Sequence, residues 1–356
     1  MKPIRVLIVD DSALVRQILS QGLAKDPQIE VAGTAHDAYA ARDLIVTKQP
    51  DVLTLDVEMP RMDGIEFLRR LMPQHPMRTI MVSSMTERGA KVTFDALAAG
   101  AIDFVTKPHG SQGLNAMISE LCEKIKMAAK VDIHAKKYFH PAPQKMHSAI
   151  RDEPFPKSSH KIIAIGASTG GTEAIRKIVV QFPLTIPGIV VVQHMPPGFT
   201  KMFADRLNKE CAIDIKEAEN GDQIGPGQML IAPGAKQMTV RREGENYRIV
   251  CQEAEKVNGH CPSVDVLFRS VAQHVGANAI GVILTGMGND GAEGMSIMRK
   301  HGARTLGQDE KSSVVFGMPN EADKRGGVEH LISLDQMASA IFRALAPAHE
   351  PGRSEP

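Results

Sequence analysis

Short apolar runs alternate with helical patterns through the first part of the chain. Five runs rich in Val, Ile and Leu are separated by stretches whose apolar residues recur every three or four positions, and these runs are residues 4–10, 29–35, 51–56, 78–83 and 101–106. Such alternation predicts the strands of a parallel sheet covered by helices on both faces. We therefore predict an α/β domain built on a parallel five-stranded sheet.

A second alternation fills most of the remaining chain. Its apolar runs are "KIIAIGAS" from residue 161, "GIVVVQH" from 188, "QMLIAP" from 228, "YRIVCQ" from 247, "AIGVILT" from 279 and "GARTLGQ" from 302. Helical patterns fall near residues 172–181, 198–208, 264–275 and 291–301. This half of the chain is predicted to be a larger, doubly wound α/β domain with some antiparallel strands.

Residues 130–160 interrupt the pattern between the two domains. They contain four prolines and show no sustained periodicity, which is typical of a linker. The four histidines of this segment fit no common spacing of metal ligands, so a solvated linker is the better interpretation. We predict domains at residues 1–129 and 161–346, and a disordered polar tail at 347–356.

Composition narrows the functional classes. The 356 residues include 42 Lys and Arg against 41 Asp and Glu, and this balance disfavours nucleic acid or an anionic membrane as the main partner. No apolar stretch reaches the roughly 18 residues of a membrane span, and the N-terminus lacks a cleavage-site pattern, so we expect a cytoplasmic protein without membrane insertion. The four cysteines show no CxxC spacing, which argues against a zinc knuckle or a disulfide framework.

Charged residues follow three strands of the first domain. Asp10 and Asp11 follow the first strand, Asp56 ends the third, and Lys107 follows the fifth. These strand ends meet at the carboxyl edge of a doubly wound sheet, where ligands bind. Three carboxylates together favour a cation, and an oxygen-only site suits Mg²⁺. Alternatively, the acids cap the following helices, as Asp11 or Ser12 could do.

The motifs "VDDS", "LDVEMPRMDG", "VSS" and "KP", in this order at strand ends, resemble the receiver domain of two-component response regulators. The resemblance covers residues 4–128 and implies a flavodoxin-like fold. It also implies that Asp56 is the phosphoacceptor, a carboxylate nucleophile that forms an acyl phosphate. Mg²⁺ would be held at Asp56 by Asp10, Asp11 and the backbone carbonyl of Val57 or Glu58, and the motif favours Glu58.

The same resemblance assigns the receiver's switch residues. Ser83 matches the hydroxyl that bonds the phosphoryl group, and Ser84 is the competing alignment for that hydroxyl. Phe104 matches the aromatic residue whose rotamer follows phosphorylation, and Lys107 supplies a positive charge.

The stretch "GASTGGT" in the second domain allows three interpretations. As a phosphate loop it places Thr172 where the lysine belongs, which weakens that interpretation. As a helix start, Ser168 or Thr169 could be the capping residue. As a G-x-S-x-G turn, with Gly166 and Gly170 flanking Ser168, it would expose a nucleophilic hydroxyl beside a helix N-terminus.

A nucleophilic serine requires a base and a carboxylate that orients the base. His194 ends one strand of the second domain, and Asp290 lies after another. The three residues are predicted to meet at one sheet edge. Their chain order, Ser168, His194, Asp290, differs from the Ser, Asp, His order of α/β-hydrolases, so the ordinary hydrolase fold is not indicated.

The motifs "GASTGG", "QHMPPGFT", "HCPSVDVLF" and "LTGMGNDG" resemble the catalytic domain of the chemotaxis protein-glutamate methylesterase (CheB) family. The resemblance implies a phosphorylation-activated serine hydrolase that demethylates glutamate γ-methyl esters on methyl-accepting chemotaxis receptors and deamidates specific glutamines. A chemotaxis histidine kinase would be the phosphodonor, Mg²⁺ would bind only the receiver, and the esterase would need no cofactor. No nucleic-acid partner is implied.

In this resemblance Ser168 attacks, His194 transfers the proton and Asp290 stabilises the imidazolium. The backbone amide of Met287 would hold the oxyanion. Thr169 sits beside the nucleophile, and His260 is a substrate-side residue or a structural one.

Two alternative functions remain at this stage. The glycines of "GMGNDG", with Asp309 and Glu310 further on, match a dinucleotide-binding loop and would make the protein an NAD-dependent oxidoreductase. That interpretation leaves Ser168 and His194 unexplained. A non-enzymatic response regulator is the other alternative, although no helix-turn-helix pattern follows the linker.

Overall fold

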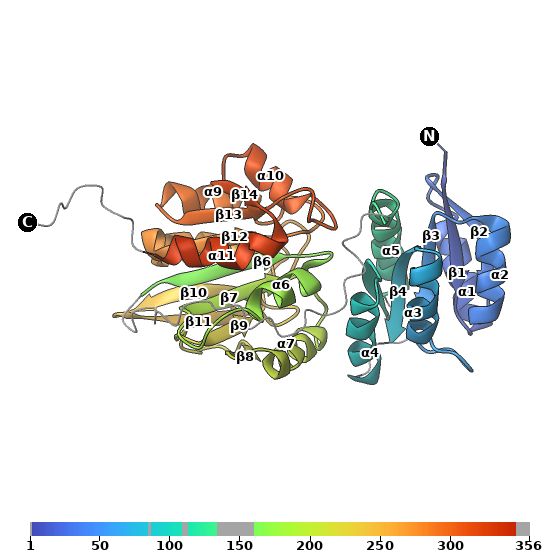
Figure 1. Cartoon of the computed structure of the whole chain (residues 1–356), viewed down its shortest axis with the longest axis horizontal. Helices are drawn as coiled ribbons and strands as arrows, with labels where there is room; N and C mark the ends of the chain where they lie inside the picture. The colour runs from blue at the N-terminus through green and yellow to red at the C-terminus, as the bar shows by residue number, and fades with distance from the viewer. Residues whose placement is uncertain (1, 85–86, 109–112, 134–159, 347–356) are drawn as a thin grey trace, which may run out of the picture. The chain divides into compact units, whose positions relative to one another are not determined.

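The computed structural model divides the chain into two compact units, Met1–Arg151 and Asp152–Pro356 (Figure 1). The residues that it describes are 2–84, 87–108, 113–133 and 160–346. The predicted tail and all but the ends of the predicted linker lie outside these residues. Each unit is described below by itself.

The first unit is a five-stranded sheet in the order β2-β1-β3-β4-β5, and all its strand pairs are parallel. The strands are β1 (Ile4–Val9), β2 (Ile29–Ala35), β3 (Val52–Asp56), β4 (Arg78–Ser84) and β5 (Asp103–Lys107). The helices are α1 (Ala13–Leu23), α2 (Ala38–Lys48), α3 (Gly64–Gln74), α4 (Glu87–Ala98) and α5 (Leu114–Ala128). The predicted five-stranded parallel α/β fold is confirmed.

Polar residues begin three of these helices. The side chains of Ser12, Asp37 and Asp63 accept backbone N–H groups in the first turns of α1, α2 and α3. Such caps satisfy donors that a helix leaves unpaired at its start. Because Ser12 caps α1, the neighbouring Asp11 is not needed for that purpose.

The second unit contains a seven-stranded sheet in the order β14-β13-β12-β6-β7-β9-β8, again with every pair parallel. Its strands are β6 (Ile162–Ala167), β7 (Gly188–Gln193), β8 (Asp214–Glu217), β9 (Gln228–Ile231), β12 (Ala279–Ile283), β13 (Arg304–Gln308) and β14 (His330–Ile332). The antiparallel component is a separate hairpin of β10 (Gln237–Glu243) and β11 (Asn246–Gln252). All six predicted apolar runs form strands, and the doubly wound fold is confirmed.

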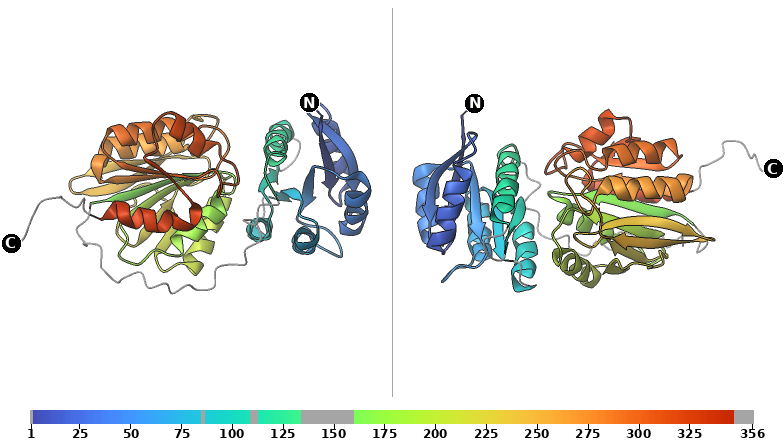
Figure 2. Two further views of the ribbon diagram at one scale, coloured as in Figure 1. Left: turned by 45° about the horizontal axis from the view of Figure 1, so that its top comes forward. Right: turned by 180° about the vertical axis from the view of Figure 1, so that it is seen from behind.

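Helices cover both faces of this sheet. They are α6 (Gly171–Val179), α7 (Phe199–Glu210), α8 (Val264–His274), α9 (Ala292–Lys300), α10 (Met318–Lys324) and α11 (Leu334–Leu345), with a 3-10 turn η2 (Gly276–Asn278). Helix α8 packs on α9 and on β10, whereas α11 packs on α6. The left view of Figure 2 shows the sheet between the red α11 and the orange helices.

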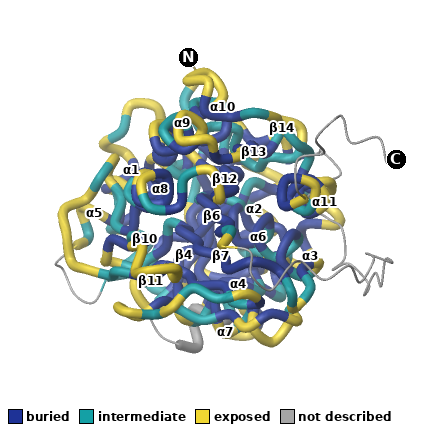
Figure 3. The backbone as a smooth tube through the Cα atoms, turned by 90° about the vertical axis from the view of Figure 1, so that its left-hand side faces the viewer, coloured by how far each residue is buried: buried dark blue, intermediate teal, exposed yellow. Residues whose placement is uncertain are grey.

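Strand periodicity explains this layering. Along β6, Ile162 and Ala164 join the core formed with α8, α9 and the hairpin, while the alternate residues Ile163 and Ile165 are equally buried outside that cluster. A strand buried on both faces is apolar throughout, as its sequence is. Figure 3 shows the central strands β6, β7 and β12 in the colour of buried residues.

Strand order reverses at the centre of each sheet. Strand β1 lies between β2 and β3, and β6 lies between β12 and β7. The carboxyl ends of such central strands are where open α/β sheets bind their ligands. Asp10 and Asp11 follow β1, and Ser168 follows β6.

Candidate functional site

The acid cluster of the first unit surrounds one lysine ammonium. Asp10 and Asp56 are both buried, and Lys107 Nζ lies 2.8 Å from a carboxylate oxygen of each. Oxygen atoms of Asp10, Asp11 and Asp56 lie within 4.8 Å of one another. Three carboxylates at this separation fit a hard divalent cation such as Mg²⁺.

Burial changes the acidity of Asp56. The pKa of this carboxyl is raised to about 6, mainly by burial and to a smaller extent by Asp10, although Lys107 and the Glu58 N–H act in the opposite direction. A buried carboxylate that is only partly compensated is a reactive group rather than a surface acid. The side chain is therefore poised between its neutral and charged forms in the absence of a cation.

The remaining predicted receiver residues lie near this cluster. Glu58 is exposed, and its N–H donates to Asp56 Oδ1 at 3.3 Å. Ser83 is buried at the end of β4 and accepts a hydrogen bond of 2.9 Å from the Thr93 hydroxyl. The competing Ser84 is half-buried, and its hydroxyl donates to Glu58 at 3.4 Å.

Phe104 is buried beside a lysine that sequence analysis did not identify. Lys124 Nζ lies 5.4 Å from the centre of the Phe104 ring and donates to the Phe104 carbonyl at 2.5 Å. It also pairs with Asp103 at 3.1 Å. Helix α5 thus holds the backbone and contacts the ring of the predicted switch residue. In the sequence, Lys124 looks like an ordinary solvent-facing lysine of an amphipathic helix, so no pattern predicted its contact with Phe104.

The turn between β6 and α6 fixes the backbone of Ser168. The Ser168 N–H donates to the Thr285 carbonyl at 3.0 Å, and the Ser168 carbonyl accepts from Gly171 at 2.7 Å and from the Gln193 amide at 2.9 Å. The N-cap of α6 is Gly170, with a φ of 77°, rather than Ser168 or Thr169. The helix-cap interpretation of this serine is therefore wrong.

His194 lies beside this turn. Its N–H donates to the Ala167 carbonyl at 3.1 Å, so the residues that follow β6 and β7 are neighbours. His194 Nε2 is 2.8 Å from Asp290 Oδ2, which leaves Nδ1 as the ring nitrogen available to a substrate or a nucleophile. Nδ1 is buried and makes no hydrogen bond, so Ser168 Oγ is not bonded to it in this structure. Such contacts commonly tighten only when substrate binds.

Asp290 is the most heavily bonded carboxylate of the site. Besides His194, its oxygens accept from the side chains of Asn258 and Ser263 and from the backbone N–H groups of Val264 and Asp265, at 2.7 to 3.2 Å. Burial alone would raise the pKa of Asp290, but the hydrogen bonds from His194, Asn258 and Ser263 outweigh it and hold the pKa well below its usual range. The carboxylate is a permanent anion next to the imidazole.

The loop after β12 passes close to Ser168 at Gly286. A Cβ at position 286 would lie 2.8 Å from Ser168 Cβ, so only glycine permits this approach. The Gly286 N–H is bonded to the Val315 carbonyl, whereas the Met287 N–H has no hydrogen-bond partner among the described residues. An unpaired backbone amide in a loop next to a serine is the kind of donor that an oxyanion hole uses.

Two further predicted residues lie in this region. Thr169 is buried, and its carbonyl accepts from the Thr285 hydroxyl at 3.0 Å. The His260 ring stacks on the His194 ring, with centroids 3.7 Å apart and planes 9° apart. His260 is thus in contact with the imidazole of the site. Asn258, Ser263 and Asp265 were not identified from the sequence, although "NG" in "VNGH" is a turn signal.

Two of the three glycines of the "GMGNDG" loop serve close packing, whereas Gly288 has open space around it and a φ of 83°. Gly286 faces Ser168 and Met318, and Gly291 faces Val264 and Ile283. Asp309, the predicted ribose ligand, accepts hydrogen bonds from the Ser312 N–H and hydroxyl. These contacts do not favour the dinucleotide interpretation.

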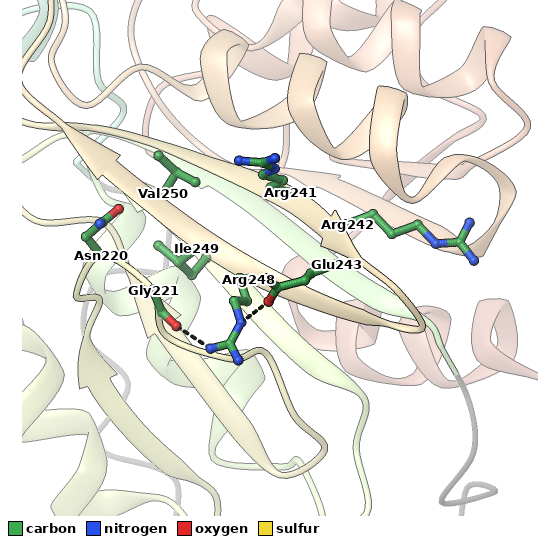
Figure 4. Close-up of a pocket in the computed structure, with 8 residues that line it drawn as sticks. All are labelled: Asn220, Gly221, Arg241, Arg242, Glu243, Arg248, Ile249 and Val250. Carbon is green, nitrogen blue, oxygen red and sulfur yellow. Dashed lines mark hydrogen bonds and ion pairs between the residues drawn. The ribbon is translucent and has the colours of Figure 1, made fainter.

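A hollow on the β10–β11 hairpin contains none of these residues. Figure 4 shows its lining, in which Arg248 reaches the Gly221 carbonyl and the Glu243 carboxylate. The hollow is also lined by Arg241 and Arg242. Its one carboxylate, Glu243, is paired with Arg248, and none of the residues predicted for catalysis lines it.

Comparison with known proteins matches both units. The CheB methylesterase family model matches residues 163–341, and the response regulator receiver domain model matches residues 6–119. Among the described helices, none is both long and apolar enough to span a lipid bilayer.

Curated relatives match nearly the whole chain. The protein-glutamate methylesterase/protein-glutamine glutaminase of Syntrophotalea carbinolica is 59% identical over 97% of this chain and 98% of its own length. The protein of the same name from Salmonella typhimurium is 51% identical over the same shares. This chain is also similar to the crystal structure of the Thermotoga maritima CheB methylesterase catalytic domain, with a TM-score of 0.50 and a sequence identity of 35%. The match covers 51% of this chain and 97% of that one.

Proposed function

We propose that Ser168, His194 and Asp290 carry out hydrolysis in this chain, which belongs to the CheB methylesterase family. The chain is a protein-glutamate methylesterase and protein-glutamine glutaminase with a receiver domain. The observation that carries this proposal is the 2.8 Å bond between His194 Nε2 and Asp290 Oδ2 at the strand end beside Ser168. The NAD-dependent and the non-enzymatic alternatives have no support from the relatives.

In the first half of the reaction Ser168 Oγ attacks the ester carbonyl while His194 Nδ1 accepts the hydroxyl proton. Asp290 stabilises the imidazolium, because it is ionised and faces the opposite ring nitrogen. The negative charge on the carbonyl oxygen is received by the Met287 N–H, with Thr169 beside it. Methanol then leaves with the proton from His194, and an acyl-enzyme remains.

In the second half a water molecule attacks the acyl-enzyme. His194 takes the water proton and returns it to Ser168 Oγ, which releases the glutamate side chain. A glutamine amide forms the same tetrahedral intermediate, and ammonia leaves in place of methanol. One set of residues therefore serves both activities.

We propose methyl-accepting chemotaxis receptors as the source of these side chains and a chemotaxis histidine kinase as the phosphodonor. Asp56 would be the phosphorylated carboxylate. The acid cluster supports this role, since Asp10 and Asp11 fit Mg²⁺ together with a backbone carbonyl at Val57 or Glu58. Bound Mg²⁺ would supply positive charge to the phosphoryl oxygens. A cytoplasmic location, expected from the sequence, stays a prediction.

Within the receiver, Lys107 would exchange its contact with Asp56 for the phosphoryl group, and Ser83 would donate its hydroxyl to that group. Phe104 would then change rotamer, which carries the signal to the receiver surface. We propose that this change activates the hydrolase.

Methanol release from methylated receptor fragments tests the proposal. Ser168→Ala should lower turnover by several orders of magnitude in a folded protein. Acetyl phosphate with Mg²⁺ should raise the rate of the wild type and leave that of Asp56→Asn unchanged. A Ser168→Ala variant with more than a small fraction of wild-type turnover would refute the assignment of the nucleophile.

A further inference from the structure

A two-residue turn next to the site is built by the sequence Val-Asn-Gly-His. Val257 and His260 exchange backbone hydrogen bonds of 3.0 and 2.9 Å. Between them, Asn258 and Gly259 have φ values of 53° and 83°. Two consecutive positive φ values define the tight hairpin turn that Asn-Gly favours. The conformation of this turn is therefore specified locally.

Asn258 lies at the surface, but its amide reaches two buried carboxylates. Its Nδ2 donates to Asp290 Oδ1 at 2.9 Å and to Asp265 Oδ2 at 2.6 Å. Asp290 and Asp265 are only 1% and 2% exposed. Because a side-chain amide has two N–H groups, one asparagine can satisfy both oxygens at once.

A second hydrogen bond fixes the position of the Asp265 side chain. Its second oxygen, Oδ1, accepts the N–H of Gly294 at 2.7 Å, which ties it to α9. Two buried carboxylates this close repel each other unless donors lie between them. The Asn258 amide is the side-chain group that lies between these two.

The other end of the turn contacts the imidazole. His260 stacks on His194, so the turn touches both partners of the His194–Asp290 hydrogen bond. Gln237 anchors this end: its buried side chain donates to the His260 carbonyl at 3.1 Å and accepts the Ser263 N–H at 2.8 Å. Strand β10 thereby holds the turn against the site.

From this geometry, and on the basis of the function proposed above, we infer that Asn258 is a positioning residue for hydrolysis. It holds the Asp290 carboxylate in the orientation that His194 requires and separates it from Asp265. It acts through Asp290 and does not touch the reacting atoms. Asn258 contributes to the site in two ways, by its turn conformation and by its side-chain amide, and substitutions can test the two separately.

Two variants keep the turn and change only the side chain. Glycine and aspartate both accept the left-handed backbone of position 258, so neither Asn258→Gly nor Asn258→Asp should alter the turn. Asn258→Gly should lower kcat about tenfold, the effect of one lost hydrogen bond to a charged group. Asn258→Asp should lower it about 100-fold or more, because a third carboxylate joins the cluster. KM should change little in either variant.

A second substitution tests the role of Asp265. In the Asn258→Gly background, Asp265→Asn keeps an oxygen for the Gly294 N–H and turns a new amide donor toward Asp290. This double variant should recover kcat at least about threefold over Asn258→Gly. The low-field proton resonance of His194 facing Asp290 should weaken in Asn258→Gly and return in the double variant.

The matched control is Asn246→Gly, which should keep wild-type kcat. Asn246 is an exposed asparagine at the tip of the β10–β11 hairpin. Wild-type kcat in Asn258→Gly and Asn258→Asp would overturn the inference and leave Asn258 as a turn residue only. Should either variant fail to fold by circular dichroism, the other decides. If Ser168→Ala is inactive while both Asn258 variants are fully active, only this inference fails; if Ser168→Ala is active, the proposed function fails.

Discussion

Gly286 is the position where one added methyl group tests the geometry of the site. A Cβ there would lie 2.8 Å from Ser168 Cβ and 2.2 Å from Met318 Sδ. Met318 Sδ belongs to a flexible side chain, whereas the backbone of Ser168 is held by two backbone hydrogen bonds and one from the Gln193 side chain. In Gly286→Ala the strain must therefore displace the nucleophile or the Met287 loop.

The size of the effect follows from contact distances. Carbon atoms in contact are normally about 3.5–4.0 Å apart, so the 2.8 Å approach requires a relaxation of about 1 Å between residue 286 and Ser168. A misplacement of about 1 Å in a catalytic group can cost about 100-fold in rate. We expect Gly286→Ala to lower kcat about 100-fold. Overpacking of this kind also costs about 1–3 kcal/mol of stability, so the variant should remain folded.

Methanol release measures the rate, and thermal unfolding measures the stability. Gly225→Ala is the control, because a Cβ at that position meets no atom within 4 Å, and it should behave as the wild type. A Gly286→Ala enzyme whose kcat stays within about threefold of wild type would show that the loop after β12 is not held against the nucleophile during the reaction.

Four further predictions address the other groups. Ser168→Ala and His194→Ala should each lower kcat by orders of magnitude, and the double variant should lose no more than either single one; a multiplied loss measured by methanol release would show that they do not act as one unit. In Mg²⁺-free protein the Asp56 carboxyl, followed by carbon NMR, should titrate near pH 6, and Mg²⁺ should shift the midpoint to lower pH; a midpoint near 4 without Mg²⁺ would contradict the burial argument. This folded-state pKa of Asp56 lies above the unfolded value of 3.8, so the contribution of Asp56 to stability is present below pH 4 and is lost as the pH rises through 6. Asp56→Asn should therefore raise Tm at pH 7 and leave Tm unchanged at pH 3.5. Lys124→Met should lower receiver stability by about 1.5–3 kcal/mol in urea unfolding, since the buried Asp103 loses a charged partner; an unchanged midpoint would mean that solvent replaces it.

The central strands could be predicted from sequence because burial on both faces makes them apolar throughout. Strands β8, β10 and β14 were not predicted, because they lack such apolar runs. Strand β10 is "QMTVRRE", in which five of the seven residues are polar or charged. Strand β8 is "DIKE", a polar edge strand, and β14 has only three residues. Helix α10 begins with Met-Pro and runs for only seven residues, too short to show periodicity. Edges and short elements take their structure from neighbours rather than from their own pattern.

The site residues also differ in how well the sequence predicts their positions. Ser168, His194 and Asp290 follow central strands, so topology alone predicts that they approach one another. Asn258 belongs to the segment between β11 and α8, whose path depends on the anchor at Gln237, and Asp265 lies in the first turn of α8. No local pattern in the sequence shows that an Asn-Gly turn will end beside a buried carboxylate.

Each unit has a buried aspartate, Asp56 at the end of β3 and Asp290 in the loop after β12, and the two differ in acidity in opposite directions. Asp56 is buried with few donors, and its pKa rises to about 6, whereas Asp290 is equally buried but accepts five hydrogen bonds and keeps its pKa low. Each environment suits the proposed role. A nucleophilic carboxylate benefits from incomplete solvation, because a strongly bonded anion would attack phosphorus slowly. A carboxylate that stabilises an imidazolium must stay ionised through the whole cycle, and its donors ensure that. The number of donors that each loop supplies, rather than the residue type, therefore distinguishes a phosphoacceptor from a member of a hydrolytic triad.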